Sequence, residues 1–497
     1  LKIRRAAMFC GAPPPRLEPT QMVDAEIDAL HGVFTSGVTR TREWRHQQLS
    51  GLASMIDTHK ADFVAALNTD LGRSEGDAII GDLALARKAV TVALGELPAM
   101  LRKKYTSSPA ILAPAASYVV QEPLGIALII TPFNYPLNQV VTPLAEAFAA
   151  GCVAVVKPSE LCAAVSALLA QLLPQFCAGA LVRAGGGEMG ARLLTRAWGA
   201  IFFAGSNAVG RSVALAAALT GAKLTLQLGG RNPVVIDDTC NMAQAARRIM
   251  FAKTLNCGAT CVAPNHAYVT RDATDAFVAA LKDAVREMYG ETPMKSAAYS
   301  RVVDDGTAAR LWNMLEEAHG GTIVLGGQVD VAGRNVAPTV VLNPSASSRL
   351  IATEVLGPVL SVVQVESVSD ALALVQAQCD AHAPLAAYLF TTNNELVDEF
   401  TRRVRSASLV VNDVGCQLYN HALPFGGVGH SGVGAVNGSA QFASAFSHER
   451  AVMTRPGGGS ARGGMLESAL RFPPFTKNQL WLMWQTLPRV FQVPSTY

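Results

Sequence analysis

Charged residues are scarce in this 497-residue chain: they make up 16% of it, against about 25% in a typical globular protein. Hydrophobic residues make up half of the chain, which can fill a large core and argues against disorder. The net charge is only +3, and no run of lysine or arginine stands out. Because a nucleic-acid partner needs a basic surface, we expect a globular protein that binds no nucleic acid.

Paired cysteines are also missing. The nine cysteines are an odd number, are scattered through the chain and form no CxxC pair. This pattern is typical of reduced thiols in an intracellular protein, and we expect the cytoplasm. Cys257, Cys261 and His266 lie close together in the sequence. Three ligands without a second cysteine pair argue against a zinc site, so we predict no bound metal.

Long apolar runs are absent as well. No uninterrupted run reaches the roughly 18–20 residues that a membrane helix needs. The first residues include three basic side chains and no acid before Glu18. We read residues 1–22 as a lead-in without fixed structure, with a short presequence as the alternative.

Hydrophobic periodicity organises the rest of the chain. Residues 23–97 show a helical pattern, and an extended stretch follows at 117–125. Short apolar strands then alternate with helices in two series, the first over 127–228 and the second over 233–413. Such alternation predicts mostly parallel sheets covered by helices. The sequence therefore favours two α/β units, within a length that suggests about three domains.

Ligands gather at the carboxyl ends of strands in such sheets, and two predicted strands end in polar residues. Lys157 ends one of them, and Glu160 follows three positions later. This pair could hold the two hydroxyls of a ribose, or it could be a solvated strand end. Gly205 and Ser206 stand between another strand and a helix, where backbone N–H groups would suit a pyrophosphate. The spacing matches neither the dinucleotide fingerprint nor a P-loop.

Two cysteines compete for a chemical role in the stretch LNCGATCVAPN at 255–265. A lone cysteine is usually a small buried hydrophobe. Cys261 is favoured by the motifs that accompany it, which are TPFNYP at 131–136, LQLGG at 226–230, ATEVLGPV at 352–359 and LPFGGVGHSGVG at 423–434.

Taken together, these motifs resemble the signature of the NAD(P)-dependent aldehyde dehydrogenases. The match is nearest to the class 3 and fatty aldehyde branch, in which FSH follows the glycine-rich motif, here at 446–448. The resemblance runs from about Ala25 to Pro474. It implies an aldehyde dehydrogenase-like α/β fold, in which a small β bridging element pairs two subunits into a homodimer. The implied parts are a Rossmann-like NAD(P)-binding domain over 23–104 and 123–228, an α/β catalytic domain over 229–414, the bridging element over 105–122 and 415–470, and a tail over 471–497.

The resemblance also implies roles for single residues. Cys261 would be the nucleophile that attacks a small-molecule aldehyde and gives a thiohemiacetal. The Asn134 side chain and the Cys261 backbone N–H would stabilise the oxyanion. NAD or NADP would contact three groups of residues: Lys157 and Glu160 at the adenosine ribose, Gly205 and Ser206 at the pyrophosphate, and Glu354 at the nicotinamide ribose.

Neighbouring positions refine this picture. Tyr135 and Leu255 are expected to border the aldehyde tunnel, and both are bulky and uncharged. They favour medium or long aliphatic and aromatic aldehydes over charged semialdehydes. Cys257 stands where the family often has a small residue, and we read it as structural, with a regulatory disulfide to Cys261 as the alternative. Leu356 replaces the usual Phe, so the nicotinamide ring would be positioned less tightly.

One catalytic position departs from the family. The family usually has Glu where this chain has Gln227, and Ala259 replaces the Gln before Thr-Cys. A carboxamide cannot accept a proton at neutral pH, and general-base help is worth roughly 10²–10⁴-fold. Three interpretations follow: hydrolysis with Glu354 as substitute base or at a slow rate, an impaired homologue that binds cofactor, or acyl transfer to coenzyme A.

The tail FTKNQLWLMWQTLPRVF at 475–491 is rich in Trp and Leu but too short to span a bilayer. Three expectations remain open for it. It could cap the aldehyde tunnel, lie as a peripheral contact at a membrane surface, or pack on the partner subunit.

Overall fold

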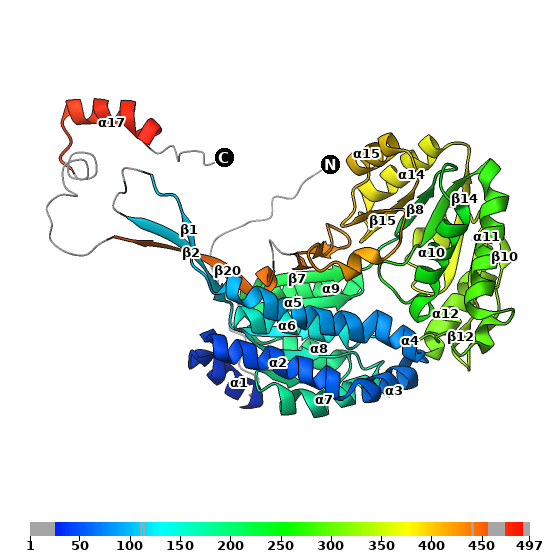
Figure 1. Cartoon of the computed structure of the whole chain (residues 1–497), viewed down its shortest axis with the longest axis horizontal. Helices are drawn as coiled ribbons and strands as arrows, with labels where there is room; N and C mark the ends of the chain where they lie inside the picture. Colours follow the sequence, from blue (N-terminus) through cyan, green and yellow to red (C-terminus); the bar gives the residue numbers. More distant parts are fainter. Residues whose placement is uncertain (1–24, 110–111, 113–114, 439–441, 456–472, 491–497) are drawn as a thin grey trace, which may run out of the picture.

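The structure is a computed structural model that describes residues 25–109, 112, 115–438, 442–455 and 473–490. Two α/β units and a β arm make up these residues (Figure 1). The expected lead-in at 1–22 lies outside the described residues. The two predicted α/β series are confirmed, because each of them forms its own mostly parallel sheet.

The first unit contains a six-stranded sheet in the order β18-β7-β6-β3-β4-β5. Strands β3 and β4 are buried along their whole length, as expected for a parallel sheet covered on both faces. Five of the strands are parallel, and β18 alone runs antiparallel, against β7. The strands are β3 (Ile126–Ile130), β4 (Val153–Lys157), β5 (Ala180–Val182), β6 (Ala200–Gly205), β7 (Lys223–Leu228) and β18 (Gly432–Val433).

Helices from two parts of the chain pack on this sheet. The amino-terminal ones are α1 (Ala25–Thr35), α2 (Arg42–Thr58), α3 (Lys60–Leu71), α4 (Glu75–Ala78) and α5 (Ala84–Met100), with a π-helical turn at Ile79–Leu83. The helices between the strands are α6 (Asn138–Ala150), α7 (Ala163–Phe176), α8 (Gly187–Leu194) and α9 (Asn207–Thr220). Their buried side chains form one hydrophobic core with the strands.

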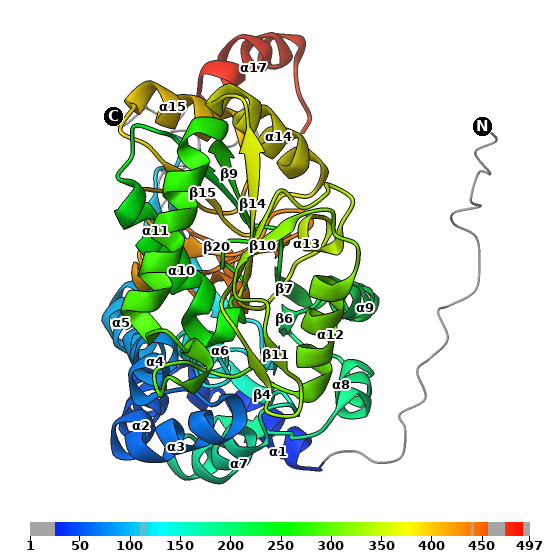
Figure 2. The ribbon, with the colours of Figure 1, turned by 90° about the vertical axis from the view of Figure 1, so that its right-hand side faces the viewer.

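The second unit contains a seven-stranded sheet in the order β10-β13-β14-β9-β8-β15-β16, in which only β10 is antiparallel to its neighbour. The strands are β8 (Pro233–Ile236), β9 (His266–Thr270), β10 (Thr322–Leu325), β13 (Thr339–Leu342), β14 (Val359–Val365), β15 (Ala387–Phe390) and β16 (Leu409–Val411). The helices are α10 (Met242–Thr254), α11 (Arg271–Tyr289), α12 (Asp305–Glu316), α13 (Arg349–Ala352), α14 (Val368–Ala381) and α15 (Asn394–Arg403). Figure 2 shows α10 and α11 side by side.

A three-stranded antiparallel sheet forms an arm that extends from the first unit (Figure 1). Its strands are β1 (Lys104–Thr106), β2 (Ala116–Pro123) and β20 (Ser447–Thr454). They come from the two ranges expected to form the bridging element. The second of these ranges, 415–470, also supplies β18 to the six-stranded sheet. The remaining strands form two short antiparallel pairs, which are β11 (Val329–Asp330) with β12 (Asn335–Val336) and β17 (Pro424–Phe425) with β19 (Val436–Asn437).

The tail forms helix α17 (Lys477–Val490), which lies apart from both α/β units in Figure 1. Trp481 and Trp484 on this helix are exposed. Among the helices in the described part of the chain, none is long and apolar enough to cross a membrane.

A buried carboxyl group ties α6 to the end of β19 and to the segment after it. Glu146 Oε1 accepts the backbone N–H of Asn437 at 2.5 Å, and the backbone N–H of Ala443 also donates to this carboxyl group. Its Oε2 is buried without a hydrogen-bond partner. Burial raises the pKa of this carboxyl to about 8, despite the two backbone hydrogen bonds. The group is therefore mostly protonated at neutral pH.

Candidate active site

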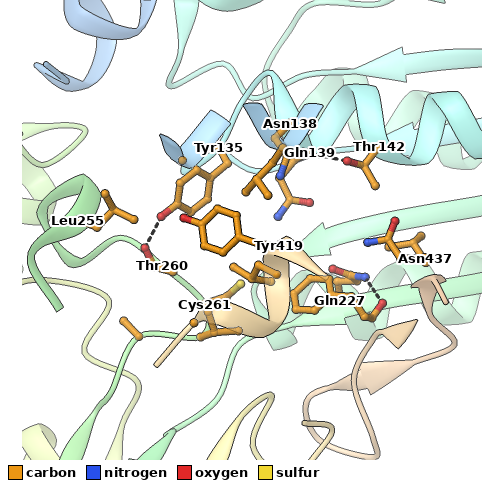
Figure 3. Close-up of a pocket in the computed structure, with 18 of the residues that line it drawn as sticks. Tyr135, Asn138, Gln139, Thr142, Gln227, Leu255, Thr260, Cys261, Tyr419 and Asn437 are labelled. Carbon is orange, nitrogen blue, oxygen red and sulfur yellow. Dashed lines mark hydrogen bonds between the residues drawn. The ribbon is translucent and has the colours of Figure 1, made fainter. Parts of the chain in front are cut away.

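One cavity is lined by residues of both α/β units. The first unit contributes Tyr135 and Gln227, and the second contributes Leu255 and Cys261 (Figure 3). Tyr135 and Cys261 lie 126 positions apart along the chain, and the fold brings them to one space. The segment after β16 closes the cavity with Tyr419.

The two cysteines have different environments. Cys261 lines the cavity, whereas Cys257 is fully buried and its thiol lies 3.7 Å from the Tyr299 hydroxyl. Both thiols are free. Burial raises the pKa of each thiol to about 12, and the nearby Glu354 carboxylate adds to the effect at Cys261. Only Cys261 can therefore meet a ligand in the cavity, and it does so from the protonated state.

A tight turn positions the loop that carries Cys261. Asn256, Cys257 and Gly258 are left-handed, with φ of 51°, 48° and 74°. A Cβ on Gly258 would come within 2.3 Å of the Gly357 backbone, so a larger residue cannot replace this glycine. Two successive left-handed residues other than glycine are strained, and such strain persists only where the surroundings enforce it.

The expected oxyanion donor, Asn134, is buried beside this turn. Its backbone carbonyl accepts the side-chain amide N–H of Asn256 at 2.5 Å. Its side-chain oxygen accepts the backbone N–H of Tyr135 at 3.2 Å. These bonds use the oxygens of Asn134, so its amide NH₂ group is the donor that could serve an oxyanion. Asn134 itself does not line the cavity, although its neighbour Tyr135 does.

Gln227 lies on β7 with its side chain in the cavity. Its Nε2 donates to the backbone carbonyl of Phe425 at 2.8 Å. The hydrogen bond fixes the amide orientation and turns the amide oxygen away from Phe425. The position expected to hold a base thus holds a neutral side chain that is bound to the glycine-rich motif.

Tyr135 and Leu255, which the sequence predicts at the aldehyde tunnel, both line the cavity. The Tyr135 hydroxyl forms a short hydrogen bond with Thr260, the residue before Cys261. Burial raises the pKa of Tyr135 far above its usual value, so the ring stays neutral. The wall beside the nucleophile candidate is therefore bulky and uncharged.

The residues expected to contact the adenosine ribose and pyrophosphate lie at the carboxyl ends of the strands of the six-stranded sheet. Lys157 ends β4 and Gly205 ends β6, with β3 between them. Lys157 Nζ forms an ion pair of 2.5 Å with Glu160. Ser206 is the N-cap of α9, and its hydroxyl accepts the Val209 backbone N–H at 3.4 Å. The amino end of α9 therefore points to the same edge as Lys157.

Glu354 lies against the two glycines that follow β7. Its carboxylate accepts the Gly230 backbone N–H at 3.2 Å, and a Cβ on Gly229 would come within 2.1 Å of it. Burial raises the pKa of Glu354 to about 7, although Lys253 and Arg310 favour the charged form. Glu354 does not line the cavity of Cys261.

Several residues of the site were not predicted from the sequence. Lys253 is buried in α10 near Glu354, and burial lowers its pKa to about 7. Its place in a helical segment gave no signal for a functional role. Tyr419 and Asn437 line the cavity but belong to none of the recognised motifs. The short hydrogen bond between Thr260 and Tyr135 could not be predicted from the sequence either, because these residues are 125 positions apart.

Comparisons with known proteins agree on one family. The profile of the aldehyde dehydrogenase family matches residues 19–452. Aldehyde dehydrogenase family 3 member H1 of Arabidopsis thaliana is 36% identical over 461 residues, 92% of this chain and 93% of that protein. The dog protein "aldehyde dehydrogenase, dimeric NADP-preferring" is 33% identical over 432 residues, 86% of this chain and 94% of that protein.

A solved structure supports the same assignment. The substrate-bound Staphylococcus aureus AldH superposes with a TM-score of 0.86 at 31% identity, over 93% of this chain and 99% of that one. The expected aldehyde dehydrogenase-like α/β fold is thereby confirmed. The chain belongs to the aldehyde dehydrogenase family and is an NAD(P)-dependent oxidoreductase of aldehydes.

Proposed function

We propose that this enzyme oxidises medium- or long-chain aliphatic or aromatic aldehydes to carboxylic acids, with Cys261 as the nucleophile. The observation that carries the proposal is the position of Cys261 in a cavity that Tyr135 and Leu255 also line. The Cys261 thiol has to lose its proton before it attacks the aldehyde carbon, because burial keeps it protonated. The backbone N–H of Cys261 and the amide of Asn134 would then stabilise the oxyanion of the thiohemiacetal.

The space beyond Cys261 suits a long chain. The cavity shares three residues, Phe251, Val414 and Tyr419, with an open groove between α10 and α11. Alanine and methionine side chains line part of the groove, next to the charged side chains of Arg247, Arg248, Asp283, Glu287 and Asp413. Phe251 and Tyr419 are about half exposed where the two spaces meet. We therefore propose that an alkyl chain attached at Cys261 passes these two rings and reaches the groove.

The residues at the sheet edge fit a nicotinamide dinucleotide. The Lys157–Glu160 pair offers a donor and an acceptor to ribose hydroxyls, and the amino end of α9 at Ser206 favours a pyrophosphate. Gly229 leaves room that a side chain would fill beside the Glu354 carboxylate, which can hold a second ribose. When bound, NAD or NADP supplies the hydride acceptor.

Hydrolysis of the acyl-enzyme needs a base other than Gln227. Glu354 is the candidate, because its carboxyl has a pKa of about 7 and its charge acts on Cys261. A base with a pKa near the working pH is the most effective. The alternatives are an impaired enzyme that binds cofactor, which the Gln227–Phe425 bond favours, and acyl transfer to coenzyme A.

The subunits are proposed to form a homodimer through the β arm. Strands β1 and β20 are the two edges of its sheet, and a strand edge carries backbone groups that can pair with another chain. The tail helix α17 is proposed to cap the tunnel, contact a membrane surface or pack on the partner subunit, because Trp481 and Trp484 are exposed.

A steady-state panel tests the function. NADH or NADPH formation is measured with hexanal, decanal, hexadecanal and benzaldehyde, each with NAD and NADP and each with and without coenzyme A. Activity without coenzyme A supports hydrolysis, and activity only with coenzyme A supports acyl transfer. Phe251→Ala should change kcat/KM for hexadecanal more than for hexanal. Cofactor binding by calorimetry without turnover would support the impaired homologue.

A further inference from the structure

A fully buried arginine lies next to the active site. Arg73 stands between α3 and α4, and its side chain has no exposure to solvent. Its guanidinium donates to Asp77 Oδ1 from Nη2 at 2.7 Å and from Nε at 2.9 Å, and to Asp82 Oδ2 from Nη1 at 2.9 Å. The fork of one arginine thus holds two buried carboxylates in fixed directions.

Asp77 connects this fork to the nucleophile loop. Its second oxygen, Oδ2, accepts the Asn256 backbone N–H at 3.0 Å and the Ser300 hydroxyl at 2.5 Å. Asn256 begins the left-handed turn that leads to Cys261, and its side chain also holds the Asn134 carbonyl. The strained turn and the proposed oxyanion donor therefore share one anchor.

Asp82 connects the fork to the other wall of the cavity. Its Oδ1 accepts the backbone N–H of Asn138, the first residue of α6, at 2.5 Å. The Arg73 guanidinium carbon also lies 5.1 Å from the ring centroid of Tyr135, within the range of a cation–π contact. Tyr135 in turn is bonded to Thr260. Arg73 therefore reaches both sides of Cys261 through separate contacts.

The local backbone is adapted to this arrangement. Asp82 lies within the π-helical turn Ile79–Leu83 and Asp77 lies two residues before it, and such turns are rare but frequent at functional sites. Within this turn, a Cβ on Gly81 would come within 2.2 Å of Arg73 Nη2 and within 2.9 Å of the Tyr135 ring. Only glycine leaves room for the guanidinium at this point.

We propose that Arg73 is a positioning residue for catalysis, which fixes the Cys261 turn and the Asn134–Tyr135 segment relative to each other through Asp77 and Asp82. The inference rests on the proposed role of Cys261. Lysine would keep the charge but not the fork, because an ammonium group cannot hold two carboxylates in the same directions. Arg73→Lys should therefore displace the turn without removing the buried cation.

The test compares Arg73→Lys with Arg45→Lys. Arg45 is also a buried arginine, but it donates to the carbonyls of Thr39 and Ala149, away from Cys261. For both variants, kcat and KM for decanal, the Kd for NAD and the Tm are measured. Displacement of a reacting group by about 1 Å can lower the rate about 10²-fold. Because the turn that leads to Cys261 should move, Arg73→Lys should lower kcat by about ten- to a hundredfold with an unchanged Kd for NAD. Arg45→Lys should keep kcat within about twofold at a similar loss of Tm.

A second measurement does not depend on turnover. The rate of alkylation of Cys261 by iodoacetamide, followed by peptide mass spectrometry, should change in Arg73→Lys and stay the same in Arg45→Lys. If the native enzyme oxidises no aldehyde, the proposed function fails, yet this rate still reports the position of the turn. Asp82→Asn, which keeps the side-chain size, replaces Arg73→Lys if the latter does not fold. Equal kcat and equal alkylation rates in both lysine variants would overturn the proposal.

Discussion

Gln227→Glu is the substitution that tests the missing base most directly. In the native enzyme the amide of Gln227 donates to the Phe425 carbonyl at 2.8 Å. A carboxylate cannot donate this bond, so the two oxygens repel each other and the new side chain turns into the cavity. The net loss of one such hydrogen bond is about 1 kcal/mol of folding stability. The fold should survive this loss.

The expected gain is in the rate of deacylation. General-base help of about 10²-fold corresponds to about 2.7 kcal/mol of barrier. Burial beside a carbonyl will raise the pKa of the new carboxyl. Each unit by which this pKa exceeds the assay pH lowers the ionised fraction of the carboxyl about tenfold. We therefore expect deacylation to become about ten- to a hundredfold faster, with the gain growing as the pH rises.

Stopped-flow fluorescence of NADH with decanal separates the steps. The native enzyme should show a burst of about one NADH per active site, followed by a slow phase. Gln227→Glu should speed the slow phase, and Glu354→Gln should slow it further if Glu354 is the substitute base. The affinity of Glu354→Gln for NAD has to be measured as well, because Glu354 is also a proposed cofactor contact.

Gln227→Ala is the matched control, because it removes the bond to Phe425 without adding a base. An equal gain in Gln227→Ala and Gln227→Glu would refute the reasoning, since release from Phe425 would then be the cause. A native enzyme without burst or turnover that Gln227→Glu does not rescue would place the defect elsewhere, for example at Ala259. The impaired-enzyme interpretation would then be preferred.

Three further outcomes are expected. Cys261→Ala should abolish dehydrogenase and esterase activity, whereas Cys257→Ala should keep most of it; the reverse order would show that the thiol is misassigned. The pKa of Glu146 is raised from 4.5 to about 8, so the unfolded chain releases this proton at lower pH than the folded one, and the stability of the native enzyme falls as the pH rises between these values. Thermal unfolding should show that the free energy of unfolding of Glu146→Gln rises relative to that of the native chain from pH 5 to pH 8, by an amount on the order of a few kcal/mol. A difference in unfolding free energy that stays constant with pH would contradict a buried neutral carboxyl. Deletion of the residues after Pro474 should change the aldehyde chain-length preference or liposome binding, and a truncated enzyme equal to the full chain in both assays would reduce the tail to packing.

The sequence by itself determined the architecture and the family. Strands β3 and β4 are buried on both faces, so they consist of continuous apolar runs that can be recognised locally. The motifs around Cys261 and Lys157 are likewise short and contiguous. The Gln227 substitution was visible for the same reason, because it occupies one position inside a recognisable motif.

Only the tertiary structure decided how these residues act together. Spacing could not establish which cysteine meets the cavity; burial of Cys257 against Tyr299 did. The bond from Gln227 to Phe425 spans 198 positions, and that from Asp77 to Asn256 spans 179. Local periodicity reports which face of an element is apolar, but it carries no signal for the partner of a polar group. Those partners are set by the packing of the two units against each other.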